Sequence, residues 1–292
     1  MKHLIPPSII WKLRRFLLPI NNNALVLEVG SGGNPYFRSN ILLDKYIETS
    51  QRHFKPLTVD RPCFICDALC LPFRNKVFDF VIAAHVLEHV ENPVQFLSEL
   101  QRVAKAGYIE VPNVVFERLN PYHDHLNELS ISQDGTLLIR KKIIPKPDPF
   151  LVDEYERTSH RSVLRLIKQN PFNFHITLFW HNEIKFSLCQ PCTIEDYGEA
   201  ETFNNFGDHV TIASSNEKAI ATFFSIIRSC FHSNLANLFR KYYILQNLRS
   251  IKLPFLLSLL QCPSCNSKSF DIVDNNCICN DCNFKFPLLG LK

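Results

Sequence analysis

The C-terminal forty or so residues carry the pattern with the most definite chemistry in this sequence. Two C-x-x-C pairs are separated by thirteen residues, and their thiols belong to Cys262, Cys265, Cys279 and Cys282. Four thiolates in such pairs form a closed tetrahedral zinc site with no open position for catalysis. A unit of this size buries too little core to fold alone, so the metal would supply stability. We therefore predict a structural zinc site, with Cys277 as a nearby candidate of ambiguous role.

A glycine-rich turn lies near the other end of the chain. Residues Val26–Pro35 read V-L-E-V-G-S-G-G-N-P, an apolar run that ends in an acid and enters a tight loop. Glycines allow positive φ angles and let a ligand approach the backbone closely. The pattern is typical of a parallel strand that leads into a loop beneath a nucleotide-like ligand.

Three further segments follow this turn in order: Ile41–Tyr46 (ILLDKY), Cys66–Phe73 (CDALCLPF) and Phe78–Val90 (FDFVIAAHVLEHV). The ordered set resembles the class I S-adenosylmethionine-dependent methyltransferases over roughly the first 110–120 residues. The loop reads G-S-G-G-N-P where G-x-G-x-G is commoner, which leaves the shape of the pocket at the methionine end open. The alternative is an α/β domain with a glycine-rich turn and no cofactor.

The resemblance implies a set of S-adenosylmethionine contacts. Glu28 would support the methionine moiety, Asp44 would accept hydrogen bonds from the ribose hydroxyls, and Asp67 would read the adenine amino group. Backbone and flanking contacts would come from Gly30, Ser31, Gly32, Ala68, Leu69 and His85. For the two aspartates the alternative is a pair of turn acids.

Histidines supply the catalytic candidates. His85, Glu88 and His89 spell H-x-x-E-H, a zinc-peptidase pattern that requires a helix and a further ligand. Here the motif follows a predicted strand directly and stops at a proline, which favours the methyltransferase interpretation. Candidates for a general base toward a hydroxyl acceptor are His89, His123 and His125, because imidazole titrates near neutrality. A polar surface loop is the alternative for the last two.

The hydrophobic pattern predicts an α/β fold with a doubly wound, mostly parallel sheet, a helical segment and a small C-terminal zinc-ribbon unit. We expect strands at 24–29, 40–43, 78–83 and 108–111, and a helix capped by Asn92 that ends at Gly107. Residues 112–160 look irregular, and 175–188 look like a closing antiparallel pair. The predicted units are a capping helix (1–20), a methyltransferase domain (21–215) with a lid or insertion at 112–160, a basic helical linker (216–252) and a zinc-ribbon domain (253–292).

Composition excludes several classes of protein. Hydrophobic residues make up 46% and charged residues 21% of the 292 positions, as in globular chains. No apolar run approaches the roughly 20 residues of a membrane span, and the N-terminus has no small-residue cleavage site. We therefore expect a cytoplasmic protein whose eleven cysteines are thiols or metal ligands. The pairs Cys63/Cys66 and Cys189/Cys192 are interpreted as small apolar side chains.

Positive charge is concentrated in two segments. Residues 2–27 carry four basic side chains and no acid, and residues 217–252 carry six and one acid. Such segments can favour nucleic acid or an anionic membrane surface, whereas solvated helix faces are the preferred interpretation. We expect the apolar stripe of 217–248 to dock the ribbon against the sheet.

These features together predict an S-adenosylmethionine-dependent methyltransferase with a structural zinc ion. A small molecule, a sugar or a lipid-linked intermediate is the expected acceptor. The zinc-ribbon segment resembles activator partners of tRNA and translation-factor methyltransferases, which are separate subunits in many systems. RNA is therefore the alternative acceptor, and a cofactor-binding adaptor without turnover is the non-enzymatic alternative.

Overall fold

The computed structural model describes residues 6–15, 18–52, 55–143, 149–190, 238, 241–242 and 251–291. Within them the main sheet has nine strands in the order β10-β11-β12-β3-β2-β1-β4-β5-β8. Its parallel centre consists of β1 (Val26–Val29), β2 (Ile41–Asp44), β3 (Cys63–Ile65), β4 (Phe78–Ala84) and β5 (Ala104–Pro112). β8 (His175–His181) pairs antiparallel with β5. The predicted α/β class with a mostly parallel sheet is confirmed.

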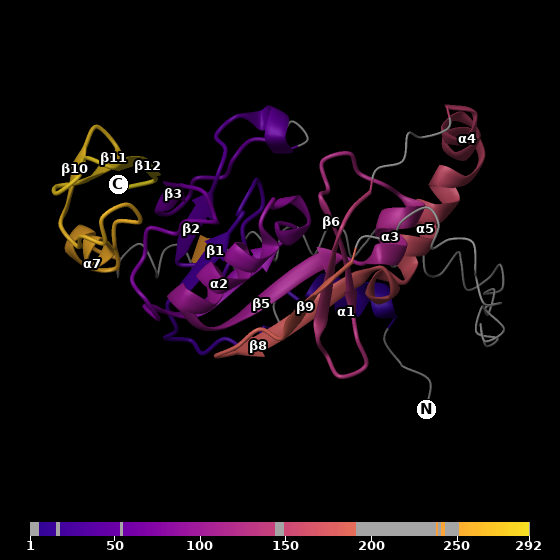
Figure 1. The fold of residues 1–292 in the computed structure, drawn as a ribbon, viewed down its shortest axis with the longest axis horizontal. Coiled ribbons are helices and arrows are strands. Elements are labelled where there is room, and N and C mark those ends of the chain that lie inside the picture. Colours follow the sequence, from indigo (N-terminus) through magenta and orange to yellow (C-terminus); the bar gives the residue numbers. More distant parts are fainter. Residues whose placement is uncertain are drawn as a thin grey trace.

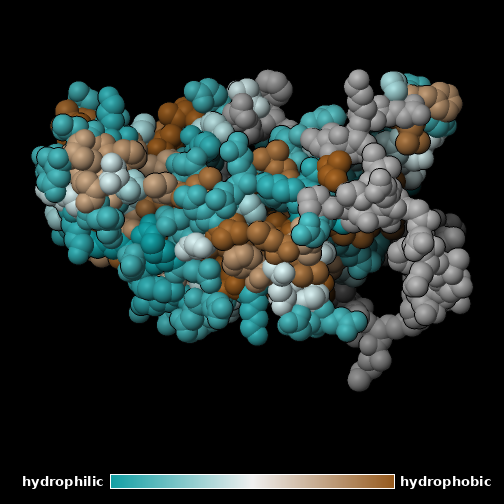
Figure 2. Space-filling model, in the orientation of Figure 1, coloured by the Kyte–Doolittle hydropathy of each residue, from teal (hydrophilic) through white to brown (hydrophobic). Residues whose placement is uncertain are grey.

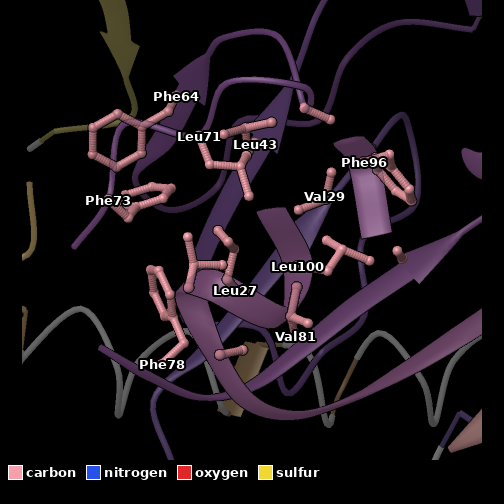
Figure 3. Close-up of a cluster of buried hydrophobic side chains, with 14 of the residues drawn as sticks. Leu27, Val29, Leu43, Phe64, Leu71, Phe73, Phe78, Val81, Phe96 and Leu100 are labelled. Atoms are coloured by element: carbon pink, nitrogen blue, oxygen red, sulfur yellow. The ribbon is translucent and has the colours of Figure 1, made fainter. Parts of the chain in front are cut away.

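Apolar side chains bury both faces of the central strands. Leu27, Val29, Leu43 and Val81 point to the face covered by α2 (Pro93–Val103), as Figure 3 shows. Alternate residues of β1, β4 and β5 form a second cluster on the opposite face. Such two-sided burial explains why these strands appear in the sequence as continuous apolar runs. The predicted cap of α2 is present, since the Asn92 side chain accepts a hydrogen bond from the backbone of α2.

The connections between the first strands contain little helix. Residues 30–40 join β1 to β2 without any helix, and the link to β3 holds one 3-10 turn, η1 (Thr49–Arg52), in its described part. Parallel strands are usually joined through an α-helix. Here the eleven-residue loop is held by side chains instead: Arg61, which is buried, donates to the backbone oxygens of Tyr36 and Ser39.

Two predicted boundaries are wrong. The helix ends at Val103, and β5 begins at once, so Gly107 lies inside the strand. A Cβ at Gly107 would lie 2.7 Å from the Trp180 ring of β8, which explains the glycine there as a packing requirement. Within the described part of the N-terminal segment, the helix α1 covers Pro7–Leu13. It contacts the helix α5 and the turn η4 described next.

The segment predicted to be irregular, 112–160, is largely ordered. It contains α3 (Val114–Leu119), β6 (Asn127–Ile131), β7 (Leu137–Lys141), α4 (Pro149–Glu154) and a short π-helix, η3 (Tyr155–Ser159). The hairpin turns at Asp134–Gly135, where glycine has φ +83°, a dipeptide typical of such turns. After it come α5 (His160–Gln169), η4 (Pro171–Asn173) and β9 (Phe186–Cys189).

The predicted closing pair is only half correct. β8 joins the main sheet, whereas β9 leaves it and pairs in parallel with β7 in a second sheet of order β6-β7-β9. α3, α4 and α5 lie at one end of the molecule, and β6 and β9 lie between them and β5 (Figure 1). Apolar side chains gather near the centre of the face in Figure 2, over the region of β5 and β9.

The cysteine-rich unit forms the other end of the molecule (Figure 1). It consists of α7 (Leu253–Ser258), β10 (Phe270–Val273), β11 (Asn276–Cys279) and β12 (Lys285–Leu289). β12 pairs antiparallel with β3, with Leu288 opposite Phe64, and Leu288, Phe286 and Leu256 belong to the same apolar core as Phe64. The unit is therefore a continuation of the main sheet. The predicted domain boundaries remain predictions.

Other predictions concern the remaining cysteines and the basic segment. Cys63 is buried in β3, Cys66 is half-buried, and Cys189 is exposed on β9. Cys192 lies outside the described residues, as does the predicted helix at 217–248 apart from residues 238 and 241–242. In the described part of the chain, no helix has the length and apolar character needed to cross a bilayer.

Candidate cofactor and metal sites

The glycine loop lies at the carboxyl ends of β1 and β2. The backbone N–H groups of Gly30 and Ser31 donate to the Leu43 oxygen at 2.8 and 3.1 Å. Gly30 and Gly32 have φ angles of +70° and +56°, which favour glycine. A Cβ at Gly30 would also lie 2.3 Å from a methyl carbon of Val86, and one at Gly33 would lie 2.7 Å from a backbone oxygen. Packing alone therefore demands glycine at two of these positions.

Asp44 and Asp67 lie close together beside this loop. One carboxylate oxygen of Asp44 accepts from the Gly32 N–H at 2.9 Å, and the other accepts from Tyr46 at 3.1 Å. The backbone oxygen of Asp44 accepts from Cys66, which brings β3 and Asp67 to the same edge. Asp67 is half-buried, accepts from the Leu69 N–H and pairs with Lys45 at 2.7 Å. Lys45 had no place in the sequence prediction, although it follows Asp44 directly.

Ser31, Ala68 and Leu69 complete the predicted contacts on this side. Ser31 is buried, and its hydroxyl has no hydrogen-bond partner in the described residues. Ala68 is buried and Leu69 is half-buried in the turn after Asp67. The structure thus brings together Gly30, Gly32, Asp44 and Asp67 at the ends of three adjacent parallel strands, through hydrogen bonds made by these residues or by their chain neighbours.

Glu28 faces the far side of the same loop. Its carboxylate is 3% exposed and accepts from the Tyr36 N–H at 2.8 Å and the Ser39 hydroxyl at 2.5 Å. Burial raises the pKa of Glu28 to about 7, against the opposing effect of these hydrogen bonds and of nearby arginines. The observed contacts give this carboxylate the role of fixing residues 36–39 beneath the site.

His85 stands at the end of β4 in a left-handed conformation, with φ +57°. Such a conformation is uncommon for a residue other than glycine and is concentrated at functional sites. Its ring nitrogens lie 3.3 Å from carboxylate oxygens of Glu88 and Glu110. Desolvation opposes protonation, but the two carboxylates outweigh it and raise the pKa of His85 to about 10.

Glu110 is the main site residue that the sequence prediction missed. It is 1% exposed in β5, and it accepts from Arg14 Nε at 2.5 Å and from the Tyr108 hydroxyl at 2.6 Å. Despite the cost of burial, Arg14 and His85 hold the pKa of Glu110 far below its usual range. An acid set between the apolar residues Ile109 and Val111 of a strand is a signal that could have identified it, because buried acids are rarely unpaired.

The candidate bases separate into two groups. His89 and His125 lie with their ring centroids 4.6 Å apart, whereas His123 is exposed. The H-x-x-E-H pattern does not form the helix that a zinc peptidase needs, since His85 precedes a three-residue 3-10 turn, η2 (Leu87–His89). His89 therefore packs against His125, which lies in the chain after α3, and does not share a helix face with His85.

The four predicted zinc ligands converge. Their sulfur atoms all lie within 4.8 Å of one another, with Cys262–Cys282 and Cys265–Cys279 separations of 3.5 Å. Zn–S bonds of about 2.3 Å in a tetrahedron give sulfur separations of roughly 3.8 Å, so the set fits zinc.

Backbone donors support the same fit. Cys262 accepts hydrogen bonds from the N–H groups two and three residues later, and Cys279 does the same in the second pair. Burial acts in the opposite direction, yet these donors and the neighbouring thiols lower the pKa of Cys279 to about 6. Cys277 is buried in β11, two residues before Cys279, and is not part of the converging set.

Comparison with known proteins agrees with this arrangement at the level of the domain. Residues 42–109 match the family model described as a methyltransferase domain. The matched segment runs from β2 to β5 and contains Asp44, Asp67 and His85. This part of the chain is therefore similar to a methyltransferase domain. No match is found among curated proteins.

Similar solved structures are remote in sequence. One is a methyltransferase from Thermotoga maritima described as a possible histamine N-methyltransferase, with 19% identity over 36% of this chain and 51% of that one (TM-score 0.28). A second, from an antibiotic biosynthesis pathway of Anabaena variabilis, has 16% identity over 40% and 53% (TM-score 0.31). A third is the Haloferax volcanii complex of the Trm112 methyltransferase activator with a putative methyltransferase, with 14% identity over 59% and 89% (TM-score 0.35). The chain spans about half the length of the first two, and a likeness at this level carries no information on substrate or partner.

Proposed function

We propose that this chain is an S-adenosylmethionine-dependent methyltransferase. The observation that carries the proposal is the convergence of the glycine loop, Asp44 and Asp67 at the carboxyl ends of β1, β2 and β3. Parallel sheets bind ligands at this edge, where the strand order reverses between β1 and β4. The methyltransferase-domain match covers two of these three elements.

The absence of a helix in residues 30–40 favours a ligand without a pyrophosphate. In dinucleotide sites a helix N-terminus follows the glycine loop and holds the pyrophosphate. The loop here continues as turns to β2. S-adenosylmethionine has no phosphate, and it offers ribose hydroxyls and an adenine amino group as donors to carboxylates.

The residues divide the work between binding and support. Asp67 is half exposed and keeps acceptor capacity, which supports its assignment to the adenine amino group. We assign the ribose to Asp44, which also holds the Gly32 N–H. Glu28 supports the loop between β1 and β2 by accepting hydrogen bonds from Tyr36 and Ser39. Bound S-adenosylmethionine would supply a methyl group on a sulfonium that is already a strong donor. The protein then contributes alignment with the acceptor.

We take a small molecule, a sugar or a lipid-linked compound as the acceptor class, and the cytoplasm as the location. His89, His123 and His125 remain the candidate bases. RNA is the alternative acceptor, because the zinc-ribbon segment resembles activator partners of tRNA methyltransferases and because residues 217–252 are basic. Of that basic segment the structure describes only residues 238, 241–242 and 251–252. Turnover to S-adenosylhomocysteine would distinguish an enzyme from an adaptor.

Calorimetry with S-adenosylmethionine and S-adenosylhomocysteine tests the cofactor. We expect Asp67→Asn to weaken binding about 10- to 100-fold, since a hydrogen bond to a charged group contributes about 1.5–3 kcal/mol. Asp79→Asn is the matched control, because Asp79 has a similar exposure and a lysine partner at the start of β4. Wild-type protein that is folded and binds neither compound would refute the proposal.

We further propose one structural zinc ion in the Cys262, Cys265, Cys279 and Cys282 set. The support is the four-sulfur convergence and the repeated N–H···S pattern. The unit resembles the activator partners of methyltransferases, which are separate subunits in many systems, and here a similar unit would be fused to its enzyme. Metal analysis of the full chain tests the site: Cys282→Ser should lose this zinc, whereas Cys70→Ser, an exposed thiol outside the set, should retain it.

A further inference from the structure

Three side chains meet at the carboxyl end of the sheet beyond β4, away from the cysteine cluster. Glu88 and His89 belong to η2, and His125 comes from the loop that precedes β6. One potential ligand atom from each lies within 4.8 Å of those of the other two. The cysteine cluster lies beyond β3, at the opposite end of the main sheet (Figure 1).

The Glu88 carboxylate has no adequate partner. It is 1% exposed, and neither oxygen accepts a hydrogen bond within the described residues. The nearest cationic group is the His85 ring at 3.3 Å, and this ring is shared with Glu110 at the same distance. A buried carboxylate without hydrogen bonds is costly unless it is paired or coordinates a metal. Glu88 therefore shares a single imidazole with a second buried acid and has acceptor capacity left for a further cation.

Both histidines are oriented as metal ligands usually are. The Nδ1 atom of His125 contacts the Glu117 carboxylate at 2.5 Å, and Glu117 is held in turn by Lys142. The Nδ1 atom of His89 contacts the Asp124 backbone oxygen at 3.1 Å. These acceptors favour a proton on Nδ1, which leaves each Nε2 lone pair available. Such carboxylate or carbonyl support is the usual outer shell of a histidine bound to a metal.

The backbone around the three side chains is also fixed. The Asn127 amide, which is buried, donates to the backbone oxygens of Leu87 and Val90, both at 2.8 Å. The Leu126 N–H donates to the backbone oxygen of Glu88 at 2.7 Å. η2 is thereby fastened to the start of β6 on both sides of the Glu88 side chain, so small side-chain movements would suffice to bring the three donors onto one ion.

We propose that Glu88, His89 and His125 form a second metal site, which takes a divalent transition-metal ion. Two imidazoles and one carboxylate suit the series from Mn²⁺ to Zn²⁺. Three protein ligands leave coordination positions open to water or to an oxygen of another molecule. This site differs from the four-thiolate cluster, which closes the coordination sphere.

Manganese distinguishes the two sites, since thiolates are poor ligands for Mn²⁺ and imidazole and carboxylate are better ones. Titration of the full chain with Mn²⁺, followed by electron paramagnetic resonance and by water-proton relaxation, should show one bound ion that retains water. The measurement uses no S-adenosylmethionine, so its failure is independent of the proposed methyl transfer.

We expect His89→Ala and Glu88→Gln to weaken Mn²⁺ binding at least tenfold. His89 is partly exposed, and glutamine keeps the shape of Glu88, so both variants should stay folded by circular dichroism. The controls His181→Ala, at the exposed end of β8, and Cys282→Ser should bind Mn²⁺ like wild type. Wild-type protein that binds no Mn²⁺ at millimolar concentration, or folded variants that bind it unchanged, would overturn the proposal.

Discussion

The buried carboxylate of Glu28 makes a quantitative prediction about stability and pH. Its pKa is 4.5 when exposed and about 7 in the folded protein, because burial disfavours the charged form. The folded state therefore holds a proton that the unfolded state releases between these two values. Stability from this group is complete below pH 4.5 and is lost as the pH rises through 7. At about 1.4 kcal/mol per pKa unit, the loss amounts to about 3 kcal/mol.

Glu28→Gln removes the titration and keeps the shape. The amide oxygen can accept the two hydrogen bonds that now come from Tyr36 and Ser39. Urea unfolding of wild type and variant at matched pH values gives the difference in unfolding free energy. We expect this difference to shift by about 3 kcal/mol in favour of the variant between pH 4.5 and 7.5, and to stay level above that.

The exposed Glu91 provides the control, since Glu91→Gln should show no such shift. A difference for Glu28→Gln that stays constant across this range would contradict the argument. A shift of the opposite sign would mean that the arginines near the carboxylate dominate over burial.

Three further outcomes can be measured with the same unfolding assay or with hydrogen exchange. Gly107→Ala should lose about 1–3 kcal/mol of stability, because its Cβ would meet the Trp180 ring at 2.7 Å. Arg14→Ala should lose about 1.5–3 kcal/mol, because the buried Glu110 carboxylate loses its Arg14 hydrogen bonds and keeps only His85 as a cationic partner, and adding Glu110→Gln to it should recover part of that loss. Cys282→Ser should release the metal and raise amide exchange in β12 and β3 together; exchange confined to β10 and β11 would argue against coupling through the sheet.

Local patterns were sufficient for much of the fold. The sequence predicted the apolar runs of β1, β2 and β4 and the Asn92 cap, because burial and capping depend on residues that are close together in the sequence. The Asp134–Gly135 turn was an equally local signal that was overlooked. Gly107 was misplaced because a glycine after a helical pattern usually ends the helix, whereas here a distant tryptophan requires it.

Long-range pairings were beyond sequence reasoning. The H-x-x-E-H motif drew attention to Glu88 and His89, but nothing in it shows that the neighbouring ring comes from His125. Glu110 meets Arg14 across nearly one hundred residues. Such contacts depend on how the strands are ordered, which is fixed by the whole core and not by any one motif. The roles of the predicted cofactor residues remain predictions.

The pairing of β12 with β3 has a consequence for solubility. Without β12, β3 would be an edge strand with unpaired N–H and C=O groups beside the apolar Phe64, a surface that invites strand-to-strand aggregation. Because the covering strand belongs to the same chain, dilution cannot remove it, unlike a separate subunit. Metal chelation should therefore produce aggregates whose amount rises steeply with protein concentration. By holding β12 in place, a metal ion in the cysteine cluster would keep the edge of β3 covered.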